Sequence, residues 1–346
     1  MKYIILAISS LTFFVACKKS ESISFQFKPI EIQTKASIRG LHVIDENNIW
    51  LSGSEGSVFR TEDGGKNWID CTIDSESDND FRSIHAFDSK HAFVLGINNP
   101  AIIYSTNDGG SSWQRADSLS APGLFFNSLK FSNKMDGMAV SDPVDDQFFV
   151  IQSQDKGKSW QRCSTLPNAL DGESNFAASN TCIEYIEPSH AWIACGGSTV
   201  RVFYTKDNGQ HWQVANTPFK SNQKADGIYS ICFKNHNNGL IVGGNYQFPE
   251  QNDRIACYTN DGGTTWQLAQ TMPSGFRSCV QYFSNNNDTI AVAIGKTGFD
   301  YSTDNGINWK TGGTKGYYTI RPIPGQFKGY VAGSDGRVTL VTIIIE

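Results

Sequence analysis

The sequence predicts an all-β fold, a seven-bladed β-propeller of four-stranded antiparallel blades whose last blade is closed by the N-terminal strand. Three observations carry this prediction. A box with Ser or Thr, Asp, Gly and Trp at regular offsets occurs six times, and successive box Asp residues lie 43 to 54 residues apart. Short apolar runs that end in small residues precede every box. The 346 residues include 32 Gly, 12% aromatic and only 18% charged residues, which disfavours helical repeats.

Each box is expected to be the turn of a β-hairpin. Its Gly supplies the positive φ of a tight turn, and the Asp side chain accepts hydrogen bonds from turn amides. A catalytic residue is needed once, whereas these residues recur six times, so we assign them a structural role without metal ligation. The pairs are Asp63 and Trp68, Asp108 and Trp113, Asp155 and Trp160, Asp207 and Trp212, Asp261 and Trp266, and Asp304 and Trp309.

The strands follow a fixed order around each box. A first strand is expected at 38–43, 81–86, 126–131, 180–185, 228–233 and 276–281. A second strand follows at 49–53, 91–96, 137–141, 191–196, 239–243 and 290–295. A third strand runs into the box and a fourth leaves it. Four short strands with regular turns make one antiparallel blade.

A seventh copy of the repeat is incomplete. Strands are expected at 317–320, 329–333 and 337–345, but no box follows them. The missing fourth strand is assigned to 24–33, which precedes the first blade. This closure removes two exposed sheet edges.

The N-terminus resembles an export signal. Lys2 precedes an apolar stretch at 4–15, and the sequence at 14–17 resembles the bacterial lipobox. The expected product is a lipoprotein cleaved before Cys17 and acylated there, exported and membrane-anchored at the periplasmic or cell surface. An ordinary secretory signal and an uncleaved anchor are the alternatives. The expected domains are the signal peptide at 1–17, a linker at 18–23 and one propeller at 24–346.

Composition excludes several classes of function. The formal net charge is −5 and no basic stripe occurs, so nucleic acid is not an expected partner. The seven cysteines after Cys17 have no CxxC spacing and the six His have no ligand spacing, so neither a metal nor a cofactor is expected. Most of these cysteines fit buried strand positions. A disulfide between Cys182 and Cys195 is the less favoured alternative.

The pattern Ser/Thr-x-Asp-x-Gly-x-x-Trp is similar to the Asp-box (BNR) repeat of sialidases and related propellers. The fuller pattern resembles the photosystem II assembly and stability factor family. It is clearest in Phe81-Arg-Ser-Ile-His-Ala-Phe, Ala92-Phe-Val-Leu-Gly96 and Tyr104-Ser-Thr-Asn-Asp-Gly-Gly-Ser-Ser-Trp113. The resemblance covers nearly the whole chain after Cys17 and implies a propeller that acts as an assembly factor. Asp-box propellers also include hydrolases, lectin-like binders and sorting receptors, so function must be argued from a site.

A candidate site lies where the first strands begin, at one mouth of the central channel. Aligning these strands gives one large or polar residue per blade: Arg39, Arg82, Asn127, Asn180, Tyr229, Arg277 and Tyr318. The three Arg side chains suit a carboxylate or phosphate. In the alternative interpretation they pair with acids of the loops 74–80, 141–146, 171–173 and 250–253 and plug the channel. Two longer loops, 141–147 and 245–254, are further candidates for recognition.

Two functions are therefore considered. The first is a monomeric, non-enzymatic binding or assembly scaffold that holds a protein, peptide or anionic glycan at the Arg-lined mouth. The second is a sialidase-type glycoside hydrolase acting on an anionic sugar. The sialidase Phe-Arg-Ile-Pro motif is absent and sialidases have six blades, so the scaffold is favoured and no catalytic residue is assigned.

Overall fold

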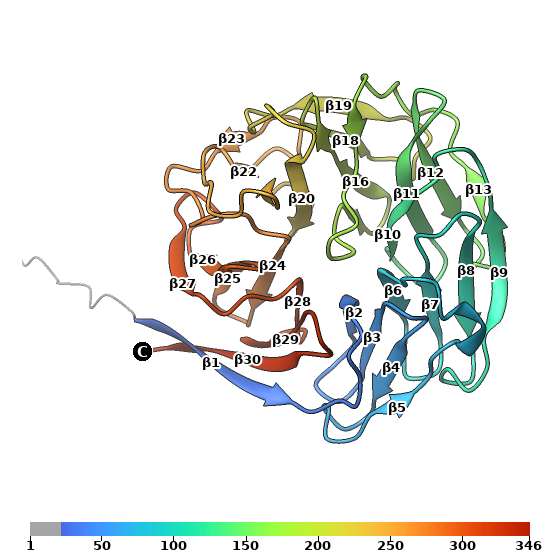
Figure 1. Ribbon diagram of the computed structural model, residues 1–346. Helices are drawn as coiled ribbons and strands as arrows, with labels where there is room; N and C mark the ends of the chain where they lie inside the picture. The colour runs from blue at the N-terminus through green and yellow to red at the C-terminus, as the bar shows by residue number, and fades with distance from the viewer. Residues whose placement is uncertain (1–21) are drawn as a thin grey trace, which may run out of the picture.

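Seven antiparallel sheets surround a central channel in the computed structural model, which describes residues 22–346 (Figure 1). The proposed signal peptide, Cys17 and most of the linker lie outside the described residues. Helix in the described part is confined to one 3-10 turn, Asp74–Glu76, which falls far short of a membrane crossing.

The seven blades follow one another along the chain. Blades 1 and 2 contain β2 (Ile38–Val43), β3 (Ile49–Gly53), β4 (Val58–Thr61) and β5 (Ile69–Asp70), then β6 (Ser83–Ala86), β7 (Ala92–Leu95), β8 (Ala101–Thr106) and β9 (Gln114–Leu119). Blades 3 and 4 contain β10 (Phe126–Phe131), β11 (Gly137–Val144), β12 (Gln147–Ser153) and β13 (Gln161–Arg162), then β15 (Ile183–Ile186), β16 (His190–Ala194), β18 (Arg201–Thr205) and β19 (Gln213–Asn216).

The remaining blades keep this order. Blades 5 and 6 contain β20 (Asp226–Phe233), β21 (Gly239–Asn245), β22 (Ala256–Thr259) and β23 (Gln267–Leu268), then β24 (Cys279–Ser284), β25 (Thr289–Gly295), β26 (Gly298–Ser302) and β27 (Lys310–Gly313). The short strands β14 (Glu173–Ser174) and β17 (Gly196–Gly197) extend the sheet of blade 5 along its inner edge. Blade 7 contains β28 (Thr319–Pro322), β29 (Lys328–Ala332), β30 (Val338–Ile345) and β1 (Ile23–Ile30).

The N-terminal strand closes the ring as predicted. β1 pairs antiparallel with β30 from Ile23 opposite Ile345 to Ile30 opposite Val338. Phe25 and Phe27 on its inner face pack against Phe299 of blade 6, with ring centroids 4.9 and 5.2 Å away. Closure therefore combines backbone pairing within blade 7 with apolar burial against blade 6.

The hydrophobic core is divided into wedges between neighbouring blades. One wedge joins Trp50 and Val58 of blade 1 to Phe81 and Val94 of blade 2, and all four are almost fully buried. Burial of such side chains contributes roughly 1.5–3 kcal/mol each. Because every blade shares its core with both neighbours, the ring holds each inner strand in place.

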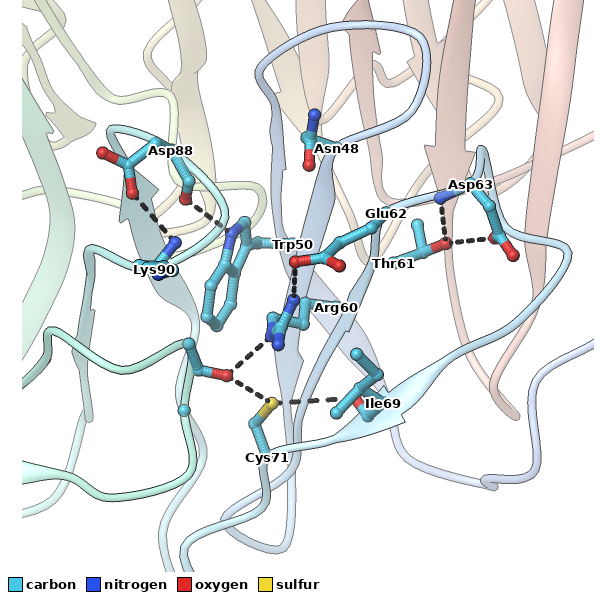
Figure 2. A network of polar contacts seen from close by, with 12 residues as sticks. Asn48, Trp50, Arg60, Thr61, Glu62, Asp63, Ile69, Cys71, Asp88 and Lys90 are labelled. Carbon is cyan, nitrogen blue, oxygen red and sulfur yellow. Dashed lines mark hydrogen bonds and ion pairs between the residues drawn. The ribbon is translucent and has the colours of Figure 1, made fainter.

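The boxes are hairpin turns that also bridge blades. Thr61 donates its hydroxyl to Asp63 (Figure 2). The Asp63 carboxylate also accepts the backbone amides of Lys66 and Asn67 at 3.0 and 2.9 Å. The hydrogen bond from the Asn67 amide is the main reason that the pKa of Asp63 falls to about 2. Arg60 donates to the carbonyl of Gly109 in the next box. In the first box, Asp63 therefore orders the turn, and Arg60 links it to the next blade.

The two faces of the ring carry different segments. The Gly64 amide donates to the carbonyl of Asn47, so the box lies beside the turn between the first and second strands. We call this side the box face. The first strands begin on the opposite side, together with the turns between second and third strands, and we call it the mouth face.

One local expectation is not met, and another, that the cysteines are buried and unbonded, is met. The segment 141–147 is no loop, because β11 and β12 extend to a tight turn in which Asp145 and Asp146 have φ values of 51° and 62°. The seven described cysteines are free and buried. Register places the carbonyl of Cys182 against the amide of Ala194, and the Cys195 sulfur instead lies 2.7 Å from the Glu173 carboxylate.

Candidate functional site: a plugged central channel

A shared hydrogen bond identifies which residue of each first strand faces the channel. In five blades one amide donates to a carbonyl at or near the end of the second strand of the preceding blade. The donors are Ile38, Phe81, Ile228, Arg277 and Tyr317, and the acceptors are Gly333, Gly53, Cys195, Gly243 and Gly295. The next residue in each blade is therefore equivalent: Arg39, Arg82, Tyr229, Ser278 and Tyr318.

Arg277 consequently lies one residue before the channel position. Its side chain is 1% exposed, and its Nε donates to Asp300 at 2.6 Å. The remaining nitrogens donate mainly to the carbonyl of Phe276 and the hydroxyl of Ser274. Ser278 occupies the channel position instead, so the structure does not bring Arg277 together with Arg39 and Arg82.

Asn180 belongs to a segment that precedes the first strand of blade 4, β15, and is not part of a blade. Glu184 pairs with Trp192 in the same way that His42 pairs with Trp50, so Glu184 corresponds to His42. Thr181 lies three residues before Glu184, as Arg39 lies three residues before His42, so Thr181 is the blade 4 equivalent of Arg39. Residues 175–181, which we call the plug, cross the channel before β15 begins. Asn180 has a φ of 57°, a backbone conformation that Asn tolerates better than most residues.

Three arginines hold four consecutive carbonyls of the plug. Arg82 donates to Ala177 and Arg39 donates to Ala178, at 3.3 and 3.1 Å. Arg321 reaches from the other end and donates to the carbonyls of Ser179 and Asn180, at 2.9 and 3.3 Å. The alternative of a plugged channel is thus realised, but mainly with backbone carbonyls as acceptors rather than loop carboxylates. Among the four acidic loops, Asp80 supplies an ion pair to a mouth arginine, Arg82, at 2.7 Å.

The plug is also fastened to the other blades. The Asn180 side chain donates to the carbonyl of Ile84 and accepts the amide of Leu129, which joins blades 2 and 3. The Ser179 hydroxyl donates to the carbonyl of Ser278 in blade 6. These contacts come from blades far apart in sequence, so the segment is fixed by the closed ring as a whole.

A cavity of about 310 Å³ lies above the plug on the mouth face. Of the seven residues expected at the mouth, five line it: Arg39, Arg82, Asn127, Tyr229 and Tyr318.

Apart from Tyr246, the rest of the lining was not predicted. It includes Phe125, Phe176, Tyr246, Phe276, Ser278 and Lys296. Tyr246 comes from the predicted long loop 245–254, which connects β21 with β22.

The cavity has an aromatic half and a cationic half. Phe176 of the plug stacks on Tyr229 with ring centroids 4.1 Å apart, and Phe276 packs edge-on against Tyr229 at 4.7 Å. On the other side the Arg39 guanidinium stacks over Tyr318 at 4.2 Å, and the Lys296 amino group lies 5.9 Å from the same ring. Such a site suits a ligand with both an apolar and an anionic part.

The cationic half retains unused donors. Within residues 22–346, Arg39 uses one nitrogen on the plug, and Arg82 uses two, on the plug and Asp80. Burial is the main cause of a lowered Arg39 pKa, and the charge of Arg82 adds to it. The lining of this cavity contains no Asp or Glu; of the three cationic groups that face it, Arg82 is paired with a carboxylate, Asp80, which lies outside the lining.

A second ring of polar residues lies at the box-face end of the first strands. Its members follow the seven equivalent channel positions by three residues each: His42, His85, Lys130, Glu184, Cys232, Gln281 and Arg321. We call this set the inner ring. The alignment of first strands contained this signal, but sequence reasoning followed only the mouth position.

Comparison with known proteins agrees with the repeat pattern. The family described as "Photosynthesis system II assembly factor YCF48" matches residues 18–161. The sortilin family matches residues 149–297, and the BNR/Asp-box repeat matches 300–311. The chain is an Asp-box propeller that resembles the photosystem II assembly factors.

Relatives that the chain matches over most of their length carry related names. The chain is 21% identical to the photosystem II assembly lipoprotein Ycf48 of Synechococcus sp. (strain CC9902), over 80% of this chain and 87% of that protein. It is 24% identical to the photosystem II stability/assembly factor HCF136 of Oryza sativa subsp. japonica, over 84% and 75%. A solved structure described as YCF48 bound to D1 peptide superposes with a TM-score of 0.63 and 17% identity, over 91% and 94%.

The geometry of the mouth does not support the hydrolase hypothesis. A carboxylate pair is the usual machinery of glycosidases. The mouth cavity of this propeller is lined by no carboxylate, and the Tyr229 hydroxyl donates to the carbonyl of Ala225. Neither half of the cavity therefore presents a tyrosine beside a glutamate.

Proposed function

We propose that this protein is a non-enzymatic binding and assembly scaffold whose mouth cavity receives a protein segment carrying a carboxylate. The observation that supports it best is the set of unused N–H groups on Arg39 and Arg82, facing a cavity without acidic lining. Charged hydrogen bonds contribute about 1.5–3 kcal/mol each when both partners are matched. The plug carbonyls already fix both guanidinium groups, so little side-chain entropy is lost on binding.

The relatives support a protein partner of this kind. One structural neighbour is described as bound to D1 peptide, and two relatives are named as photosystem II assembly proteins. We propose by analogy that this propeller assists assembly of a membrane complex by holding an exposed peptide segment. The aromatic half of the cavity, with Phe176 and Tyr229, takes an apolar side chain of that segment.

The proposal includes a lipid anchor. One relative is named a lipoprotein, and the sequence at 14–17 resembles a lipobox. Acylation at Cys17 would hold the exported, monomeric propeller at a membrane surface where its partner emerges.

A binding assay with matched variants tests the mouth. The probe is a fluorescent D1 peptide, with a second version in which every Asp, Glu and terminal carboxylate is replaced by its amide. We expect Arg39→Gln combined with Arg82→Gln to weaken anisotropy-detected binding at least roughly tenfold, because charged hydrogen bonds are lost. Arg162→Gln serves as the control, since Arg162 lies on β13 and contacts Phe149 instead. The amide peptide should bind all proteins equally weakly.

Equal affinity of the double variant and the control for the acidic peptide would remove the mouth from the proposal. Displacement of the peptide by sialyllactose at similar concentrations would instead favour an anionic glycan as the occupant. Circular dichroism of each variant shows whether the β-sheet fold is intact.

A further inference from the structure

The box-face end of the channel contains a second cavity, which we call the lower chamber. It has a volume of about 230 Å³ and is separated from the mouth cavity by the plug. Asn180 and Thr181 of the plug belong to its lining. Its wall is formed by five members of the inner ring: His42, His85, Lys130, Gln281 and Arg321.

The chamber carries an uncompensated positive charge. Lys130 is paired with the buried carboxylate of Glu184. Arg321 lies within 4 Å of no described carboxylate, and its guanidinium is bound by neutral groups, namely carbonyls, Thr319 and the sulfur of Cys279. Arg321 is partly buried and no described carboxylate lies beside it, so an anion in its surroundings is stabilising.

Neutral donors surround this charge. The His42 and His85 rings contact each other edge-on with centroids 4.5 Å apart, and both line the chamber. Burial, followed by the charges of Arg321 and Lys130, lowers the pKa of His42 to about 3, so its ring is neutral near pH 7. Among residues 22–346, neither the His42 ring nor the Gln281 amide has a hydrogen-bond partner, so both are available to a ligand.

We propose that the lower chamber binds a small oxyanion, such as inorganic phosphate or a short organic acid, between Arg321, Lys130 and His42. The limited volume excludes a folded partner, and the single net positive charge of Lys130, Glu184 and Arg321 matches an anion. Arg321 also holds two plug carbonyls, so the bound anion stabilises the plug from below. This site is independent of the partner proposed for the mouth.

Thermal unfolding and calorimetric titration of the whole protein test the site. The probes are sodium phosphate, sulfate and citrate, compared with sodium chloride at equal ionic strength. We expect at least one probe to raise the midpoint of unfolding and to bind with a single saturable site. Arg321→Gln should weaken that binding at least roughly tenfold, because the chamber loses its uncompensated positive charge.

Arg39→Gln is the matched control, because Arg39 also binds a plug carbonyl but faces the mouth cavity. The proposal requires that this variant keeps wild-type affinity for the probe. If Arg321→Gln does not fold, Gln281→Leu replaces it, with a smaller expected loss of roughly threefold, because a neutral hydrogen-bond donor of the chamber is lost. NMR adds a local readout, since a bound anion shifts the His42 ring signals.

Two results would overturn the proposal. The first is that no probe stabilises the protein beyond chloride. The second is that Arg39→Gln and the chamber variant lose affinity alike, which would place the anion at the mouth. Peptide binding at the mouth can fail without affecting either result.

Discussion

At the scale of single residues, Arg277 shows how a shift of one position changes the role of a side chain. In blades 1, 2 and 6 the residue two positions after the shared amide pairs with the second strand: Gly40 with Ser52, Ser83 with Leu95 and Cys279 with Ile294. The residue in between is the channel residue, which is an arginine in blades 1 and 2 and Ser278 in blade 6. Phe276-Arg-Ser aligned with Phe81-Arg-Ser because the residue types match, although Arg277 corresponds to Phe81 in the structure.

The buried pair of Arg277 and Asp300 predicts a large stability effect. Both side chains are 1% exposed, so Arg277→Gln leaves the Asp300 carboxylate buried without its cation. We expect a loss of roughly 3–5 kcal/mol in the free energy of unfolding, measured by urea denaturation. The double variant Arg277→Met/Asp300→Leu should recover much of that loss. If the single and double variants are equally unstable, packing rather than uncompensated charge explains the effect.

At the scale of elements, the plug is the part that the sequence did not reveal. Box and strand segments repeat, so their register could be compared between copies. Residues 175–181 occur once and make their contacts with blades 1, 2, 3, 5, 6 and 7 through the closed ring. A segment defined by contacts of such long range has no local pattern to recognise, which is why carboxylates were expected where carbonyls are found.

Asp142, which accepts a hydrogen bond from the plug, makes the stability of the protein depend on pH. It accepts the amide of Asn175 at 2.8 Å and the side chain of Asn127 at 3.1 Å. Burial raises its pKa to about 6. The folded state thus binds this proton more tightly than the unfolded state, so the contribution of Asp142 to stability falls as the pH rises from about 4 to about 6.

We therefore expect Asp142→Asn to flatten the pH dependence of unfolding in this interval. The amide oxygen of Asn can still accept from Asn175 and Asn127, so the hydrogen bonds are kept. Urea denaturation at several pH values measures the effect, with Asp145→Asn in the adjoining turn as the control. A wild-type slope in the Asp142→Asn protein would contradict the assignment.

At the scale of the whole molecule, the ring closure was predictable because each blade repeats the same order of strands. The seventh copy lacks a box, and the segment that completes it precedes the first blade. The sequence therefore contained both halves of the closure, and the structure pairs them as β30 and β1. The apolar wedges that join blade 7 to blades 1 and 6 depend on this final pairing.

Removing the apolar side of β1 should weaken the whole ring. Phe25 and Phe27 pack on Phe299, so we expect Phe25→Ala with Phe27→Ala to lower the free energy of unfolding by roughly 2 kcal/mol or more. Gln26→Ala, on the exposed side of the same strand, is the control. Frayed β1 would also expose the edge of β30, so the double variant should associate at high concentration in light scattering.

The plug has a consequence for orientation. A ring of seven similar blades offers a ligand seven nearly equivalent rotational settings, and a ligand on the axis would bind in any of them. The plug enters from blade 4 alone, uses arginines of blades 1, 2 and 7, and leaves aromatic side chains on one side of the mouth. The plug thereby makes the sides of a near-symmetric mouth different from one another. A peptide bound there can then lie in one orientation, with a fixed N-to-C direction.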